Sequence, residues 1–135
     1  MENGVETRRL SGLYKTEPWG IEDQDWFVNA VCEVRTSLDV RKLLAVIGKI
    51  ESQMGRIRKE KWGPRLIDID ILEFNKMKIQ SEKLTLPHPY YPERSFVLLP
   101  FADLAPNWIP TGTNQPIREL INLLDDENLP VLVSE

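Results

Sequence analysis

The sequence has very few residues that cross-link a chain or ligate zinc: Cys32 is its one cysteine among 135 residues. A single thiol cannot form an internal disulfide, and no Cys/His pair has the spacing of a zinc site. The longest apolar runs, such as 96–99, fall far below the roughly 18 residues of a membrane span. Residues 1–12 also lack the apolar stretch of a signal peptide. These absences predict a soluble chain in a reducing compartment, the cytoplasm, with no membrane partner.

A strong charge of one sign is also missing. Seventeen Lys and Arg face 21 Asp and Glu, a net charge of −4 that disfavours binding to a nucleic-acid backbone. Neither a Walker loop nor a Gly-x-Gly-x-x-Gly stretch is present, which argues against the commonest nucleotide-binding folds. The exception to the overall balance is residues 55–65, where five Lys and Arg accompany one Glu. The length predicts one domain over 1–135.

Hydrophobic periodicity predicts a mixed chain. The most regular helical pattern covers 39–54, with Asp39 as N-cap and Gly55 just after the last turn. Shorter helices are expected at 95–99 and 117–124. Alternating residues predict strands at 10–14, 27–36, 67–72 and 131–133, with loops at 17–25 and 55–65 and an extended, proline-bearing course through 75–92. This order lacks regular βαβ alternation, so we expect an α+β sandwich with helices on one face of a mainly antiparallel sheet.

Asp68 and Asp70 stand two residues apart on the predicted strand at 67–72, so both side chains leave the same face with Cα atoms roughly 6.6 Å apart. Such a pair can hold one or two hard cations through oxygen, although a solvated strand face would show the same pattern. The arginine-rich loop that precedes the strand favours the first interpretation. Arginine forks and carboxylate-held Mg²⁺ bind the same phosphate oxygens, so the two clusters predict a polyphosphate site.

The run 55–71, Gly-Arg-Ile-Arg-Lys-Glu-Lys-Trp-Gly-Pro-Arg-Leu-Ile-Asp-Ile-Asp-Ile, closely resembles the signature of the 6-hydroxymethyl-7,8-dihydropterin pyrophosphokinases of folate biosynthesis. The resemblance extends to 14–20, 27–30, 84–89 and 93–98, and covers about residues 10–125. It implies a ferredoxin-like α+β sandwich and transfer of the β,γ-pyrophosphoryl group of ATP to the pterin hydroxymethyl oxygen, with release of AMP. The implied small molecules are ATP, the pterin and two Mg²⁺ ions.

The resemblance also implies roles at matched positions. Asp68 and Asp70 would hold the metal. Arg56, Arg58 and Arg65 would be the catalytic residues, carried by mobile loops that close over the triphosphate and exclude water. The positions that match nucleotide contacts are Ile71, Thr85, His88 and Arg94. From the residues alone, His88 would more often be a polar loop residue between prolines than a nucleotide contact.

For the pterin, the resemblance implies a ring stacked between Phe27 and Phe96, with Asn29 reading its polar edge. Further matched positions are Thr16, Glu17 and Trp19, in a loop that contacts the pterin, and Trp62, which would pack over the closed site. Family members often carry Tyr where this chain has Phe27. Taken singly, Phe27, Phe96 and Trp62 would more often be core or surface residues than ligand platforms.

The main departure from the family pattern precedes Leu10. A strand ending in a Gly-Ser-Asn-like turn and a following helix are expected there, and neither is recognisable. Loss of an interior strand would leave backbone groups unpaired. We therefore expect a monomer that is less stable than a chain extended by this strand and helix, and that turns over slowly or, without the strand, self-associates. Two other functions stay open: a protein that binds pterin and nucleotide without turnover, and an RNA-binding α+β domain.

Overall fold

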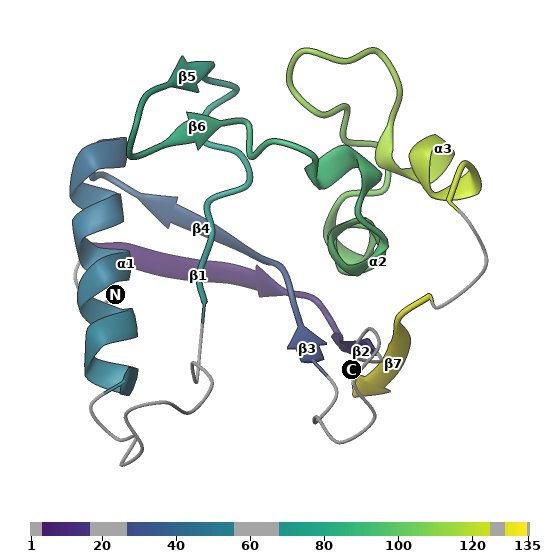
Figure 1. The fold of residues 1–135 in the computed structure, drawn as a ribbon, viewed down its shortest axis with the longest axis horizontal. Helices are drawn as coiled ribbons and strands as arrows, with labels where there is room; N and C mark the ends of the chain where they lie inside the picture. Colours follow the sequence, from purple (N-terminus) through teal and green to yellow (C-terminus); the bar gives the residue numbers. More distant parts are fainter. Residues whose placement is uncertain (1–3, 17–26, 56–67, 125–128, 135) are drawn as a thin grey trace.

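The computed structural model describes residues 4–16, 27–55, 68–124 and 129–134. In chain order the elements are β1 (Val5–Leu10), β2 (Leu13–Thr16), β3 (Phe27–Asn29), β4 (Cys32–Thr36), α1 (Val40–Gly55), β5 (Ile79–Gln80), β6 (Thr85–Leu86), the short 3₁₀ helix η1 (Tyr91–Glu93), α2 (Ser95–Leu104), α3 (Ile117–Asn122) and β7 (Val131–Ser134) (Figure 1). Across these ranges, no helix has the length and apolar character needed to cross a bilayer.

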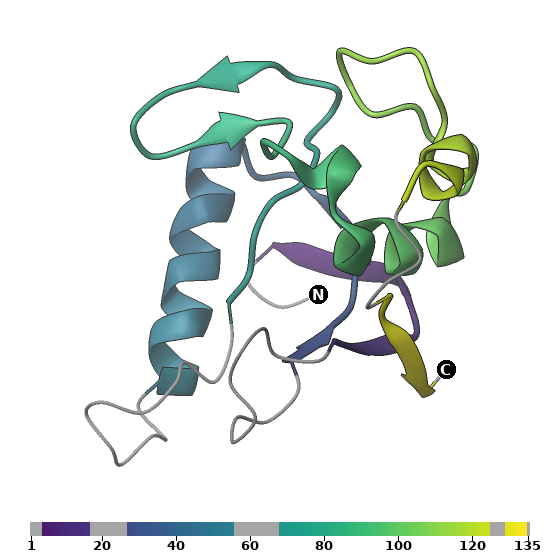
Figure 2. The same ribbon diagram turned by 45° about the vertical axis from the view of Figure 1, so that its right-hand side comes forward.

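The strands form three small sheets rather than the single sheet expected. β1 pairs with β4, β2 lies between β3 and β7, and β5 pairs with β6, all antiparallel. The α+β class and the antiparallel pairing are therefore confirmed. Two views show the β5–β6 hairpin beside the N-terminal end of α1, with α2 and α3 grouped on the other side of the molecule (Figures 1 and 2).

Helix α1 confirms the prediction for 39–54. The Asp39 carboxylate accepts the Lys42 backbone N–H at 2.9 Å, as an N-cap side chain should. Val40 and Leu43 are buried, Leu44, Ile47 and Ile50 of the same stripe are half-buried, and Met54 at its end is exposed. Gly55 is the last residue of the helix rather than the one after it. Local spacing and capping are enough to account for this element.

The strands predicted at 10–14 and 27–36 are each interrupted, at Ser11 and at Val31, and these two residues are hydrogen-bonded to one another. Between β1 and β2, the Ser11 backbone N–H donates to the Val31 carbonyl at 2.9 Å, and the Ser11 hydroxyl accepts the Val31 N–H at 2.8 Å. Ser11 is buried, so these bonds satisfy polar groups that lie away from solvent. The continuous strands predicted at 10–14 and 27–36 are therefore wrong: the chain leaves one sheet and enters another at Ser11 and at Val31.

The predicted strand at 67–72 is also wrong, because residues 68–72 join no sheet in the described structure. Their backbone bonds go elsewhere: the Ile69 N–H donates to the Glu51 carboxylate at 2.7 Å, and the Leu72 carbonyl accepts the His88 N–H at 2.9 Å. The alternation of faces nevertheless holds. Asp68 and Asp70 are exposed, whereas the isoleucines beside them are half-buried. Ile67 lies outside the described residues.

The proline-bearing region is more regular than expected. Residues 75–92 contain the β5–β6 hairpin and η1 instead of a simple extended course. Helix α2 runs on to Leu104 with Pro100 inside it, so the prediction of a helix ending at residue 99 is too short. Helix α3 and strand β7 confirm the predictions at the C-terminal end, although α3 stops at Asn122.

The best-buried apolar cluster lies around α2. Tyr91, Leu98 and Ile117 are fully buried and Phe101 nearly so, and they pack together. The Tyr91 and Phe101 rings stack with centroids 5.6 Å apart, and Trp108 lies at the edge of Phe101. Helix α2 also contacts β2, β3 and β4. This cluster consequently fixes the positions of η1 and of the first turn of α2.

Candidate active site

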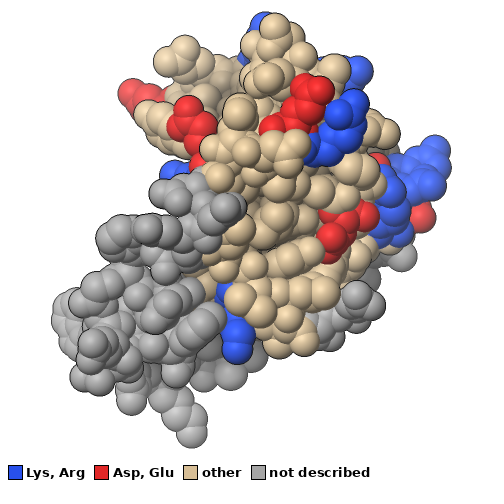
Figure 3. All heavy atoms as spheres, turned by 90° about the vertical axis from the view of Figure 1, so that its right-hand side faces the viewer, with Lys and Arg blue, Asp and Glu red and all other residues tan. Residues whose placement is uncertain are grey.

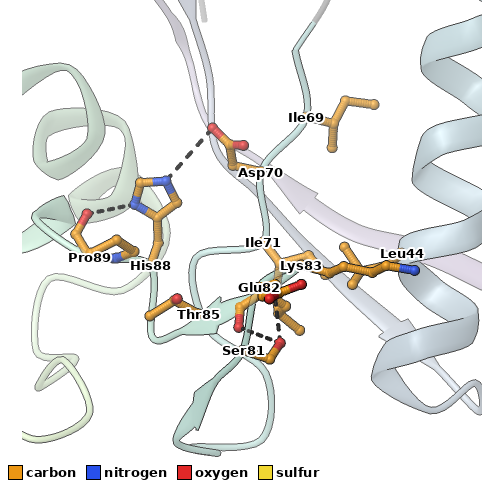
Figure 4. Close-up of a pocket in the computed structure, with 11 residues that line it drawn as sticks. Leu44, Ile69, Asp70, Ile71, Ser81, Glu82, Lys83, Thr85, His88 and Pro89 are labelled. Carbon is orange, nitrogen blue, oxygen red and sulfur yellow. Dashed lines mark hydrogen bonds and ion pairs between the residues drawn. The ribbon is translucent and has the colours of Figure 1, made fainter.

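A pocket of about 280 Å³ opens between α1, the segment 69–71 and the β5–β6 hairpin (Figure 4). Its lining consists of one residue from α1, the segment that carries the second aspartate, the turn of the hairpin and the residues after β6. These are Leu44, Ile69, Asp70, Ile71, Ser81, Glu82, Lys83, Leu84, Thr85, His88 and Pro89. The pocket brings together four residues predicted for the site, namely Asp70, Ile71, Thr85 and His88.

The polar centre of the pocket is the pair formed by Asp70 and His88, whose side chains point toward one another (Figure 4). The imidazole Nε2 lies 3.9 Å from the Asp70 Oδ2 atom, and Nδ1 lies 2.8 Å from the Pro89 carbonyl. A ring with its proton on Nδ1 donates to that carbonyl and presents the Nε2 lone pair beside the carboxylate. The pair then offers two electron-rich atoms to a cation or to a ligand donor.

Asp68 and Asp70 fit a hard divalent cation. Both are exposed on the same side of the segment, and the Asp70 side chain keeps 67% of its surface accessible. Magnesium is bound in nucleotide enzymes by one or two carboxylates, with waters and substrate phosphates completing the octahedron. In the ranges that the structure describes, no group of three or more Asp, Glu, His or Cys forms a cage. The two aspartates therefore suit a metal that arrives with a phosphate ligand.

Three of the residues predicted for the pterin, Thr16, Phe27 and Asn29, lie on the paired strands β2 and β3. Thr16 pairs with residue 27, and Tyr14 pairs with Asn29, so these positions share one face of the sheet. The Thr16 hydroxyl oxygen is buried and has no hydrogen-bond partner among the described atoms. Buried polar groups are nearly always satisfied, so this hydroxyl is a candidate for a ligand contact. Helix α2, which carries Phe96, packs against both strands.

Arg94, which is predicted to contact the nucleotide, lies over the ring of Phe96, which is predicted to stack on the pterin. Its guanidinium lies 5.7 Å from the Phe96 ring centroid and 6.0 Å from that of Tyr90. Tyr90 adopts a left-handed conformation, with φ of 69°, immediately before η1. A cation held over two rings is oriented by them, and guanidinium matches phosphate geometry. The structure consequently places an oriented positive charge next to the predicted pterin platform.

Several predicted site residues cannot be placed. Glu17, Trp19, Arg56, Arg58, Trp62 and Arg65 lie outside the described residues, as does the side chain of Phe27. Their roles remain predictions from the sequence.

Sequence reasoning missed part of the pocket wall. Leu44 of α1 and the turn that carries Ser81, Glu82 and Lys83 line the pocket but are not among the residues predicted for the site. The Ser81 N–H and hydroxyl both bond the Leu84 carbonyl, which shapes this turn. The polar run between two short apolar stretches at 79–86 was an available signal for a hairpin.

One face of the described residues carries charged side chains of both signs. In Figure 3, Lys and Arg side chains of the described residues lie beside Asp and Glu and are separated by uncharged surface. On this face the described residues show no continuous basic patch, and the basic residues of 56–65 lie outside the described residues.

Comparison with known proteins gives a consistent family. The model of the family described as 7,8-dihydro-6-hydroxymethylpterin-pyrophosphokinase matches residues 1–106. A Methylorubrum extorquens protein named 2-amino-4-hydroxy-6-hydroxymethyldihydropteridine pyrophosphokinase is 41% identical, over 93% of this chain and 78% of its own length. A Bacillus subtilis protein of the same name is 45% identical, over 74% of this chain and 60% of its own length.

The third relative carries a different name. A Dictyostelium discoideum protein named as a folic acid synthesis protein is 42% identical over 88% of this chain, which spans only 18% of that longer protein. The match to the family model and the extent of the Methylorubrum alignment agree with the presence of Asp70, Thr85 and His88 in one pocket. The chain belongs to the 7,8-dihydro-6-hydroxymethylpterin-pyrophosphokinase family.

Proposed function

We propose that the chain transfers pyrophosphate from ATP to 6-hydroxymethyl-7,8-dihydropterin in folate biosynthesis. The hydroxymethyl oxygen attacks the β-phosphorus, the bond from the β-phosphorus to the oxygen bridging to the α-phosphate breaks, AMP leaves, and the hydroxyl proton is lost. The observation that carries this proposal is the family membership together with the convergence of Asp70, Thr85 and His88 on one pocket. The relatives' names support the same substrate.

Within this proposal, separate groups of residues bind the metal ions, the nucleotide and the triphosphate. Asp68 and Asp70 hold two Mg²⁺ ions, which when bound neutralise charge on the phosphates. Ile71, Thr85 and His88 bind the nucleotide in the pocket, and Arg94 contributes a fixed positive charge to the phosphates. Arg56, Arg58 and Arg65 bind the triphosphate from the segment outside the described residues.

For the pterin, Thr16, Asn29 and Phe96 form the part of the site that the described residues contain. The amide of Asn29 offers both a donor and an acceptor to the edge of a pterin ring. The buried Thr16 hydroxyl would gain the hydrogen-bond partner it lacks in the structure. Glu17, Trp19, Phe27 and Trp62 complete this half in the proposal. We further propose that the protein acts in the cytoplasm as a monomer.

The test is incubation of the purified chain with Mg²⁺, ATP and the hydroxymethyl-dihydropterin, with separation of AMP, ADP and the pterin diphosphate. AMP formation that depends on the pterin supports the proposal. ADP as the product would indicate transfer of a single phosphoryl group instead. Binding of both ligands without either product would favour the binding-only alternative. Omission of Mg²⁺ is expected to abolish AMP formation, because the phosphate charges are then not neutralised.

A further inference from the structure

A carboxylate outside the pocket, that of Glu73, accepts hydrogen bonds from two distant segments, at Tyr91 and at 108–111. The Tyr91 hydroxyl donates to its Oε2 atom at 2.6 Å, and the Thr111 backbone N–H donates to the same atom at 2.9 Å. The Thr111 hydroxyl donates to Oε1 at 2.6 Å, and the Trp108 indole N–H approaches Oε2 at 3.4 Å. An ionised carboxylate accepts through about four lone-pair positions, so the donors match its capacity.

The local backbone is built to present these donors. The Pro110–Thr113 turn is closed by the Thr113 N–H to the Pro110 carbonyl at 2.9 Å, with Gly112 at φ of +88°. This turn directs both the N–H and the hydroxyl of Thr111 to one acceptor. On the other side, Tyr91 is fully buried, and its pKa is raised by burial and by the Glu73 carboxylate. Its hydroxyl therefore remains a donor throughout the neutral pH range.

The network reaches the pocket through the segment 88–91. The His88 N–H donates to the Leu72 carbonyl at 2.9 Å, and three residues later the Tyr91 hydroxyl bonds the next residue, Glu73. Both ends of the segment are thus held by residues that directly continue the chain from Asp70. The Tyr91 carbonyl in turn accepts the Arg94 N–H at 3.2 Å. The place of the His88 ring beside Asp70 depends on these attachments.

We propose that Glu73 is a positioning residue that acts through the Tyr91 hydroxyl to hold the His88 imidazole beside Asp70. Glu73 does not line the pocket and is not itself catalytic. The consequence for turnover rests on the proposed function, but the position of the imidazole does not.

The chain supplies a matched pair of variants. Tyr91→Phe and Thr111→Val each remove one hydroxyl that lies 2.6 Å from the same carboxylate, and each preserves the shape of the side chain. Only Tyr91 belongs to the segment that carries His88. A merely structural role for Glu73 predicts equal effects of both changes on the site. A positioning role predicts an effect of Tyr91→Phe alone.

A second pair changes Glu73 itself. Glu73→Met has a similar length and accepts no hydrogen bond of comparable strength, so it should displace the segment. Glu73→Gln should restore the wild-type behaviour, because its amide oxygen can accept at the Oε2 position while its N–H₂ group donates to the Thr111 hydroxyl. Should Glu73→Met fail to fold, the Tyr91→Phe and Thr111→Val pair decides the question alone.

The first readout is NMR of the His88 ring, which is unambiguous because the sequence contains one histidine. In Tyr91→Phe and Glu73→Met, the ring signals should move toward their position in Asp70→Ala, whereas Thr111→Val and Glu73→Gln should leave them unchanged. The second readout is steady-state kinetics. Tyr91→Phe should raise the KM for ATP about fivefold, the equivalent of one net hydrogen bond, with little change in KM for the pterin.

Unmoved His88 signals in Tyr91→Phe, or equal movement in Thr111→Val, would overturn the positioning role. The NMR measurement needs no substrate, so the two proposals can fail separately. Ring signals that respond as expected in a chain that forms no AMP would contradict the proposed function and leave the positioning role standing. Normal AMP formation with unmoved ring signals would do the reverse.

Discussion

Replacement of Asp70 by Asn separates catalysis from folding more clearly than any other change at this site. The side chain is 67% exposed, and its Oδ2 atom lies 3.9 Å from the Nε2 atom of the His88 ring. An exposed pair of this kind contributes about 0–1 kcal/mol to stability. Removal of the charge should therefore change the free energy of unfolding by no more than about 0.5 to 1 kcal/mol.

The effect on turnover should be much larger. A fixed charge that balances charge development in a transition state is typically worth about 3–4 kcal/mol, which corresponds to a loss of about 10²–10³ in rate. The same reasoning applies to Asp68. The assay is AMP release with saturating Mg²⁺ and both substrates, paired with urea unfolding of each variant. Glu119→Gln on α3 is a suitable control, because it also removes an exposed carboxylate from an ion pair.

The control should retain full activity and near-wild-type stability. If Asp70→Asn keeps more than a tenth of the wild-type rate while its unfolding curve is unchanged, the metal assignment is refuted, and the aspartate pair is then an ordinary solvated surface. If both activity and unfolding change by similar free energies, Asp70 acts mainly through the fold.

Three other outcomes are expected. Phe27→Ala should weaken pterin binding by about 1–3 kcal/mol, the typical value of a stacking platform, and leave ATP binding nearly unchanged; equal losses by calorimetry would mark Phe27 as a core residue. Leu98→Ala should cost about 3–5 kcal/mol in urea unfolding, because Leu98 is fully buried in the α2 cluster, and a smaller loss would show that the cluster collapses around the cavity. Burial and the Glu73 carboxylate raise the Tyr91 pKa above its ordinary value of 10.0. The unfolded chain therefore releases the phenol proton before the folded chain does as the pH rises past 10. Above that pH the free energy of unfolding of wild type should fall, relative to that of Tyr91→Phe, by up to about 1.4 kcal/mol per pH unit. Parallel urea titrations of the two proteins at pH 8 and pH 11 would reveal a constant difference if the reasoning is wrong.

The elements that were predictable are those whose signals are local. Helix α1 carries its own cap at Asp39 and its own apolar stripe, and both act within a few residues. The exposure of Asp68 and Asp70 also followed from alternation alone. Strand pairing is not a local property, because it depends on which distant segment of the chain lies beside the strand. Residues 68–72 alternate like a strand, yet their backbone bonds go to Glu51 and to the backbone of His88.

The candidate site likewise combines features that local sequence predicts with long-range contacts that it does not predict. Individual residues such as His88 were identifiable by resemblance, but the side chains that hold them in place were not. Thr111 is 38 residues from Glu73, and Ser11 is 20 residues from Val31, so neither hydrogen bond has a signature in a local window. Sequence patterns indicate which groups are polar and which face they occupy. They do not indicate which long-range partner satisfies a buried donor.

The hydrogen bond from the Ile69 N–H to Glu51 has a consequence for how the family could vary. It ties the last turn of α1 to the start of the aspartate segment, on either side of the stretch that carries the basic cluster. For a loop with fixed ends, doubling the length costs only about 0.6 kcal/mol of closure entropy. Closure entropy therefore sets only a weak limit on the length of the stretch between Gly55 and Asp68, and any strict limit is expected to come from Arg56, Arg58 and Arg65, which the proposed function places there.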